Sequence, residues 1–176
     1  MAVIHYQFEA IHPFYDGNGR AGRILNVLYL IEKGLLDLPV LYLSSYIIQN
    51  KTEYYERLLD ITRNDSWESW IKYMLEAVEA TSLETIGKVH AIRELFDHTI
   101  EQVKDRLPKI YSKELVEVLF HQPYCKIKFL EEHGIAKRQA AAEYLKSLEE
   151  LGLLESKKVG KELLYLNKPL YEIFKK

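Results

Sequence analysis

Apolar residues recur at helical spacing on both sides of a short polar segment near the start of the chain. Ile4, Phe8 and Ile11 lie on one stripe of "AVIHYQFEAI". "RILNVLYLIEKG" repeats apolar residues at the same spacing and ends at Gly34, a residue suited to the position just after a helix. The pattern predicts one helix that arrives at the polar segment 12–23 and another that leaves it.

The same spacing continues as far as Pro108. "TEYYERLLDITRN" predicts a helix capped by Thr52, and "WESWIKYMLEAVEA" predicts a helix capped by Ser66, with both tryptophans in the core. Residues 82–107 are expected to continue as a long helix that Pro108 ends. The N-terminal part of the chain is therefore expected to be helical throughout.

After Pro108 the pattern changes. "SKELVEVLFHQP", "CKIKFLEEHG" and "AKRQAAAEYLKSLEELG" predict three short helices, and "LLESKKVGKELLYLN" alternates like two strands around a turn at Gly160. Three helices followed by a hairpin are typical of a winged helix-turn-helix. We predict a mainly α protein with two domains, residues 1–108 and residues 112–176.

Composition narrows the class of protein. Hydrophobic residues make up 48% and charged residues 28% of the chain, an ordinary balance for a globular protein, and the net charge of −2 favours neither nucleic acid nor an anionic membrane as partner. The single cysteine, Cys125, excludes an internal disulfide and is expected to be a half-buried structural thiol. The most apolar region, residues 35–48, is interrupted by Asp37 and Pro39, so we expect no membrane span and a cytoplasmic protein.

The polar segment "HPFYDGNGRAGR" has the residue types of an anion site. Gly17 and Gly19 flank Asn18, and such a turn can aim consecutive backbone N–H groups into one concavity. The helix that follows adds its free N–H groups, and Arg20 and Arg23, three residues apart, place two guanidiniums on the same side. This combination favours a polyphosphate over a single carboxylate.

Two further residues of the segment suggest chemistry. A carboxylate at Asp16 would repel a bound phosphate unless a cation intervened, and Mg²⁺ binds one or two carboxylates together with phosphate oxygens. His12 lies at the end of the incoming helix and is suited to taking a proton from a hydroxyl. Phe14 is expected to be the hydrophobic anchor of the loop.

Each of these residues also has an ordinary interpretation. A D-G-N-G string alone is usually a turn, a histidine at a helix end is usually only that, and two arginines on a helix are usually a solvated face. A calcium loop is excluded because no acidic residue occupies its twelfth position. The functional interpretation depends on all the roles coinciding within twelve residues.

The segment resembles the signature of the Fic family of nucleotidyltransferases, H-P-F-x-[DE]-G-N-G-R-x-x-R. The fixed positions of that signature are met by His12, Pro13, Phe14, Asp16, Gly17, Asn18, Gly19, Arg20 and Arg23. The segments "GLLDLPVLYLSSYII", "KTEYYERLL" and "WESWIKYMLEAV" are similar to later helices of the family's helical core, and the C-terminal winged helix resembles a module that bacterial members carry.

The resemblance implies protein AMPylation, in which a Tyr, Ser or Thr hydroxyl attacks the α-phosphate of ATP. It implies His12 as general base, Asp16 as ligand of Mg²⁺, and Arg23 as partner of the γ-phosphate. The residues expected to bind the nucleotide are Gly17, Asn18, Gly19, Arg20, Ala21, Gly22, Arg23, Asn50 and Tyr54, the last two beside the adenosine. The expected partners are a target protein and the chain itself.

The sequence departs from the family before the motif. Family members have several helices and a flap hairpin there, and many have an inhibitory helix with a glutamate, whereas the motif here begins at residue 12. We therefore interpret the chain as N-terminally truncated. Apolar surface is expected to be exposed on Ile4, Phe8 and Ile24, which would favour homo-oligomers.

The winged helix leaves an alternative function open. "AKRQAAAEYLKSLEELG" would be the recognition helix of a DNA-binding regulator in which the nucleotide pocket is a sensor or a relic. The charges of that helix cancel, and the wing residues Lys157, Lys158 and Lys161 also suit an exposed hairpin edge. Docking to protein is therefore favoured over DNA.

Overall fold

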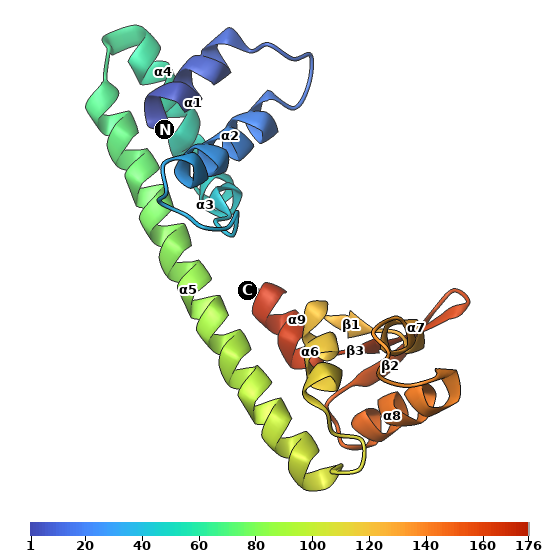
Figure 1. Cartoon of the computed structure of the whole chain (residues 1–176). Helices are drawn as coiled ribbons and strands as arrows, with labels where there is room; N and C mark the ends of the chain where they lie inside the picture. Colours follow the sequence, from blue (N-terminus) through green and yellow to red (C-terminus); the bar gives the residue numbers. More distant parts are fainter. Residues whose placement is uncertain (176) are drawn as a thin grey trace. The chain divides into compact units, whose positions relative to one another are not determined.

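The computed structural model describes residues 1–175 and divides into two compact units, residues 1–87 and residues 88–176. The division falls inside helix α5 (Trp67–Arg106), not at Pro108 where the sequence pattern changes. The reason is that Val103 is fully buried in the core of the second unit, with Leu107 packed against it. Each unit is described separately below (Figure 1).

The first unit contains the helices predicted around the polar segment. They are α1 (Ala2–Ile11), α2 (Asn18–Glu32), α3 (Leu43–Gln49), α4 (Lys51–Asn64) and the first part of α5. α4 is flanked at its start by Asn50, so the predicted cap at Thr52 was wrong by two residues. The helical pattern of residues 67–80 and its predicted continuation over 82–107 form the single helix α5, in which Thr81 donates its hydroxyl to the carbonyl of Ala77 at 2.6 Å.

Apolar side chains of α3, α4 and α5 form the core of the first unit. Trp70, Tyr73 and Met74 are almost completely buried there, together with Ile47 and Ile61. The predicted core position of Trp70 is thus confirmed, and its indole N–H donates to the carbonyl of Ala2 at 3.0 Å, which fixes the start of α1. α1 packs most closely on α2 (Figure 1).

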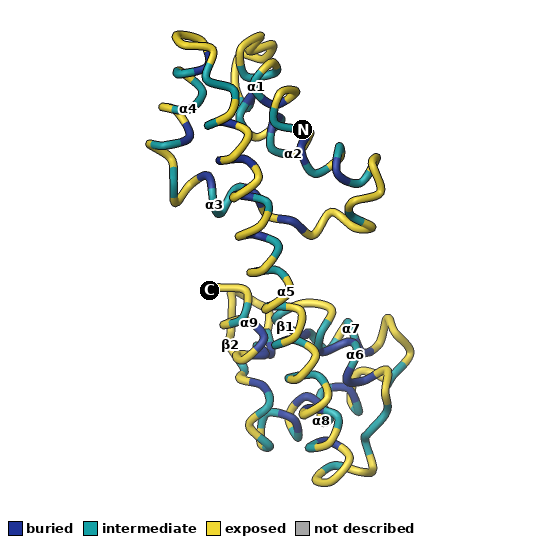
Figure 2. Tube along the Cα trace, turned by 90° about the vertical axis from the view of Figure 1, so that its left-hand side faces the viewer, coloured by how far each residue is buried: buried dark blue, intermediate teal, exposed yellow. Residues whose placement is uncertain are grey.

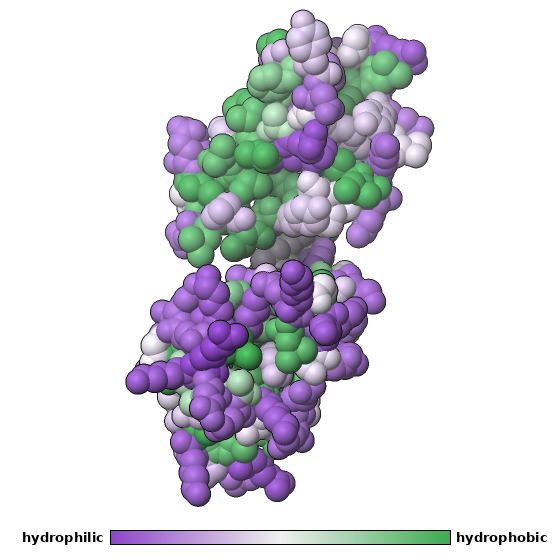
Figure 3. Space-filling view, turned by 90° about the vertical axis from the view of Figure 1, so that its right-hand side faces the viewer, coloured by the Kyte–Doolittle hydropathy of each residue, from purple (hydrophilic) through white to green (hydrophobic). Residues whose placement is uncertain are grey.

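Most of the residues on the buried face of α2 are polar or small. Asn18, Gly22, Asn26 and Leu30 are buried at a spacing of four residues, whereas Ile24 is 60% exposed. Figure 2 shows buried and exposed positions alternating along the helices of this unit. The exposure predicted for Ile4 and Ile24 is therefore confirmed, while Phe8 is only partly exposed. Apolar side chains gather on the surface of this unit in Figure 3. α2 thus presents Gly22 and Asn26 to α1 and leaves Ile24, Leu25 and Leu28 exposed.

The second unit has the predicted order of three helices and a hairpin. Its elements are α6 (Lys113–His121), β1 (Tyr124–Cys125), α7 (Ile127–Glu132), α8 (Arg138–Glu150), β2 (Glu155–Val159), β3 (Glu162–Leu166) and α9 (Lys168–Lys175). The sheet is antiparallel in the order β1-β3-β2, with Tyr165 of β3 opposite both Cys125 and Ser156. β1 and α9 were not predicted, because a two-residue strand and a short terminal helix leave little periodicity to detect.

Cys125 is buried in the core of the second unit, and burial raises the pKa of its thiol to about 12. A thiol with so high a pKa is almost entirely protonated at neutral pH and is a poor nucleophile. The predicted structural role of Cys125 is confirmed. Among the described residues, none of the helices combines the length and apolar content needed to cross a membrane.

Three charged residues of α8 are engaged in contacts within the second unit. Glu149 Oε1 accepts a hydrogen bond from the backbone N–H of Ser156 at 2.8 Å, and Lys146 pairs with Glu150 at 3.8 Å. The zero net charge of this helix therefore does not give the charge that α8 presents to a partner, because some of its charged groups already have partners within the unit. Whether that partner is protein or DNA stays a prediction.

Candidate functional site

The junction between α1 and α2 positions His12. This residue follows the last helical residue of α1 and takes left-handed backbone angles (φ 49°, ψ 57°), while its N–H donates to the carbonyl of Phe8 at 3.0 Å. The side chain is exposed, and Phe14 packs its ring on that of Phe8 with 6.1 Å between centroids. Phe14 is nevertheless 53% exposed, so it anchors the loop less than predicted. The chain turns sharply at His12, and the loop that follows projects from the first unit (Figure 1).

The side chain of Asn18 holds this loop. Asn18 is 2% exposed, its Oδ1 accepts from the N–H of Phe14 at 2.9 Å, and its Nδ2 donates to the carbonyl of Phe14 at 2.6 Å. The sequence analysis assigned Asn18, for its backbone alone, to the concavity of consecutive backbone N–H groups, called the nest below. The structure adds a side-chain clamp that fixes the spacing between His12 and the start of α2.

The start of α2 provides backbone donors for an anion. Gly17 has φ 85°, a left-handed angle that favours glycine, and precedes the first helical residue. The first intrahelical bond runs from the N–H of Ala21 to the carbonyl of Gly17 at 2.9 Å. The N–H groups of Asn18, Gly19 and Arg20 come before that bond, so the helix itself gives them no acceptor. This is the arrangement of donors that binds phosphate at helix N-termini.

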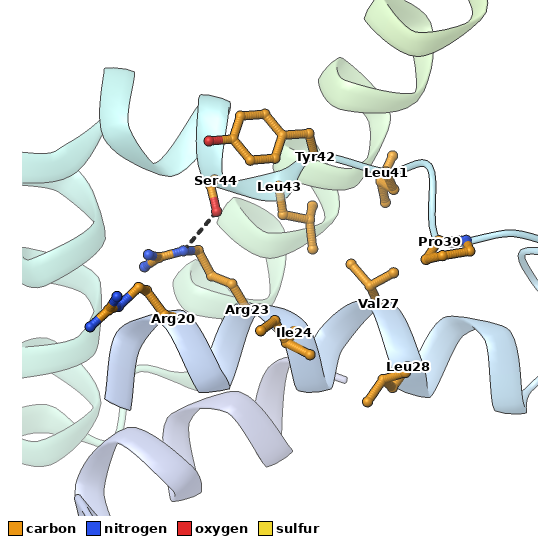
Figure 4. A pocket seen from close by; sticks show the side chains of 10 residues that line it. All are labelled: Arg20, Arg23, Ile24, Val27, Leu28, Pro39, Leu41, Tyr42, Leu43 and Ser44. Carbon is orange, nitrogen blue, oxygen red and sulfur yellow. Dashed lines mark hydrogen bonds between the residues drawn. The ribbon is translucent and has the colours of Figure 1, made fainter. Parts of the chain in front are cut away.

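The two arginines lie beside these donors. Arg20 reaches Asp16 with 3.2 Å between Nη2 and Oδ2, and Arg23 Nε donates to Ser44 Oγ at 2.8 Å (Figure 4). Arg20 and Asp16 are highly exposed, so their ion pair contributes little to stability and can open for a ligand. The guanidiniums of Arg20 and Arg23 stand at one end of a pocket of about 380 Å³ that is otherwise mainly apolar (Figure 4).

Asp16 is the residue through which a metal ion could be held. Its Oδ1 accepts from the N–H of Gly17 at 2.7 Å, which orients the carboxylate at the edge of the nest. No group of three or more His, Cys, Asp or Glu residues capable of holding a metal ion occurs within residues 1–175. One carboxylate suits Mg²⁺ that takes its other ligands from phosphate and water, and does not suit a metal bound by protein alone.

Three of the predicted nucleotide-binding residues have their contacts elsewhere. Gly22 faces α1, and the side chain of Asn50 donates to the carbonyl of Tyr46 at 2.9 Å. Tyr54 is 4% exposed, and its hydroxyl lies 2.8 Å from His5 Nε2. Tyr54 is therefore a core residue with no surface to offer a nucleotide in this structure.

A groove beside the motif was not predicted. It lies between α1 and α4, measures about 370 Å³, and includes Ala10, two residues before His12. Its lining residues are Tyr6, Glu9, Ala10, Tyr55, Leu58, Leu59 and Thr62. The signal available in the sequence was the pair of tyrosines in "NKTEYY", of which Tyr55 faces this groove and Tyr54 faces the core.

His5 connects three helices beneath the motif. It is fully buried, with Nε2 2.8 Å from the hydroxyl of Tyr54 on α4 and Nδ1 3.0 Å from Nδ2 of Asn26 on α2. Its ring also stacks on Trp70 of α5. Burial lowers the pKa of His5 to about 4, against a smaller opposite effect of the Gly22 backbone, so His5 is neutral at pH 7. The position of α1, and with it that of His12, depends on this neutral ring.

Comparisons with known proteins show which families and relatives the chain is similar to. Residues 1–30 match the model of the Fic/DOC family, and residues 95–170 match that of the "Protein adenylyltransferase SoFic-like, C-terminal domain". The chain is 29% identical over 146 residues to "Probable protein adenylyltransferase aq_aa38" of Aquifex aeolicus, an alignment covering 75% of this chain and 44% of the relative. It is 30% identical over 86 residues to "Protein adenylyltransferase fic-1" of Caenorhabditis elegans, covering 49% of this chain and 16% of the relative. The chain thus spans less than half of these relatives.

Proposed function

We propose that this chain, whose residues 1–30 match the Fic/DOC family, transfers AMP from ATP to a hydroxyl group of a target protein. The observation that carries the proposal is the junction of α1 and α2. There an exposed imidazole, His12, is joined by a clamped loop to a helix start with free N–H groups and two arginines. These groups supply a base and an anion site on one short stretch of chain.

The reaction assigns a role to each group. The acceptor oxygen attacks the α-phosphorus of ATP, the bond from that phosphorus to the bridging oxygen of the β-phosphate breaks, pyrophosphate leaves, and His12 takes the hydroxyl proton. The N–H groups of Asn18, Gly19 and Arg20 bind phosphate oxygens, and Arg23 neutralises the far end of the triphosphate. Mg²⁺ held by Asp16 would neutralise phosphate charge. Positioning and electrostatics account for most of the catalysis in such transfers.

The groove between α1 and α4 is the place we assign to the nucleoside. It is lined by the aromatic ring of Tyr55 and by Leu58 and Leu59, which suit the faces of a base. It includes Ala10, which lies two residues before His12 in the chain. Tyr55 thus replaces Tyr54 as the proposed contact to the base. The use of ATP and the single unpaired Cys125 fit a cytoplasmic protein.

Removal of the imidazole tests the proposed transfer. We expect His12→Ala to lower the transfer of label from α-labelled ATP to protein by at least about 100-fold, because the general base is lost. His90→Ala is the matched control, since His90 is an exposed histidine on α5, and it should transfer at the wild-type rate. Undiminished transfer by His12→Ala would remove His12 from its proposed role.

A further inference from the structure

Two histidines of the second unit lie side by side, outside the proposed transfer site. His121 is the last residue of α6, and His133 directly follows the last residue of α7. Their ring centroids are 5.2 Å apart, and their ring planes are inclined by 60°. Both residues are exposed, so neither belongs to the core of the unit. The fold and the proposed transfer leave this pair of histidines without a role.

Buried neighbours fix the backbone beneath each ring. Leu119, two residues before His121, is almost fully buried, and Leu130, three residues before His133, is fully buried in the same core. The backbone N–H of His133 also donates to the carbonyl of Phe129 at 3.1 Å, which closes the end of α7. Packed elements such as these hold a ligand site more precisely than a loop does.

The hydrogen bonds define which ring nitrogens are free. Nδ1 of His133 lies 2.8 Å from the carbonyl oxygen of Phe129, and because a carbonyl only accepts, Nδ1 carries the proton and Nε2 keeps its lone pair. Histidines that bind metals typically donate their other N–H to a carbonyl or carboxylate in this way. Within residues 1–175, neither ring nitrogen of His121 has a hydrogen-bond partner, so this ring can turn toward His133. Each histidine therefore has a nitrogen available for a metal ion.

The spacing of the two rings suits a zinc ion. Zinc binds imidazole nitrogen at about 2.0–2.1 Å with tetrahedral angles, which places the centroids of two rings on one ion about 5 Å apart. The 5.2 Å between the centroids of His121 and His133 matches this spacing. A right angle at the ion, as in square-planar copper sites, would bring the centroids to about 4.5 Å. The arrangement therefore favours a tetrahedral ion.

We propose that His121 and His133 bind one zinc ion that links the end of α6 to the end of α7. Imidazole is a preferred ligand of zinc, whereas Mg²⁺ prefers oxygen ligands, so the chemistry of this site differs from that proposed at Asp16. The carboxylates nearest in sequence, Glu117 and Glu132, each form an ion pair with a lysine one turn earlier in the same helix, at 3.2 Å and 3.0 Å. Because no third protein ligand stands beside the pair within residues 1–175, water completes the coordination shell.

Calorimetric titration of the whole chain with zinc chloride tests the site. We expect a heat of zinc binding in the wild type that is lost in His121→Gln and in His133→Gln, because each variant keeps only one imidazole of the pair. His98→Gln, which removes an exposed histidine of α5, and His12→Gln, which removes the proposed base, are the controls and should both keep this heat. Magnesium chloride should give no heat that depends on His121 or His133.

Thermal unfolding gives a second readout of the same site. Zinc should raise the melting temperature of the wild type, because an ion that bridges two helices binds only the folded state, and it should not raise that of His121→Gln or His133→Gln. Without zinc, both variants should melt close to the wild type, since the two residues are exposed. No zinc binding by the wild type would leave the pair as an aromatic contact only, and zinc binding that persists in either variant would place the ion elsewhere. Each of these two results would overturn the inference.

Discussion

Alanine at position 22 is expected to abolish transfer from ATP and to destabilise the first unit. A β-carbon there would stand 2.5 Å from Glu9 Oε1, 2.9 Å from His5 Cε1 and 3.1 Å from His5 Nδ1. Because the ring of His5 is held by Asn26 and Tyr54, it cannot give way, and α1 must move off α2. That movement carries His12 away from the N–H groups that bind phosphate.

The expected sign is opposite to that of an ordinary helix substitution. Glycine to alanine inside a helix usually stabilises by roughly 0.5–1 kcal/mol, whereas forced overpacking typically costs about 1–3 kcal/mol. Thermal unfolding of Gly22→Ala should therefore begin several degrees below the wild type. Gly87→Ala is the matched control, because Gly87 lies inside α5 with no heavy atom within 4 Å of its would-be β-carbon. Gly87→Ala should melt at or above the wild type and transfer normally, and Gly22→Ala behaving like it would contradict the α1–α2 packing.

Acidification is expected to destabilise the first unit between about pH 6.5 and pH 4 because of His5. Burial lowers the pKa of His5 from 6.5 to about 4, so in this range the unfolded chain binds a proton that the folded chain does not. The stability contributed by neutral His5 is therefore complete above pH 6.5 and is lost as the pH falls toward 4. The full loss amounts to roughly 3 kcal/mol. The raised pKa of Glu9 works in the opposite direction and offsets part of it.

The loss has a structural cause. A neutral imidazole can accept a hydrogen bond at one nitrogen and donate at the other, as the contacts to Asn26 and Tyr54 require. A protonated ring donates at both nitrogens and would face the donor Nδ2 of Asn26. Denaturant unfolding of the wild type and of His5→Asn at pH 8 and pH 5 measures the effect. His5→Asn should be less stable at pH 8 but lose less on acidification, and parallel losses in the two proteins would exclude His5 as the source.

The site was predictable where it depends on adjacent residues. His12, Asp16 and the segment 17–23 lie within twelve residues, so a helix end, a glycine turn and a helix start bring them together whatever the rest of the chain does. The helices on either side were also predictable, because the apolar spacing that indicates each of them lies within one short segment of the chain. The clamp by Asn18 was missed because an asparagine between two glycines indicates a turn and does not show which backbone groups its side chain binds.

Features that depend on tertiary contacts could not be predicted. Tyr54 and Tyr55 are equivalent in the sequence, and only the packing of α4 on α1 decides that Tyr54 contacts His5 and Tyr55 faces the groove. The buried face of α2 was missed because it is polar, and its partner His5 lies on another helix.

The central claim is that the start of α2 binds the charged end of ATP. Calorimetric titration with ATP and Mg²⁺ tests it most directly, on wild type, on Arg20→Ala and on Arg63→Ala, which removes an exposed arginine near the end of α4. We predict a heat of binding in the wild type that persists in Arg63→Ala and disappears in Arg20→Ala, since Arg20 stands over the nest at Gly17. No heat in the wild type, or the same heat in Arg20→Ala, would contradict the account.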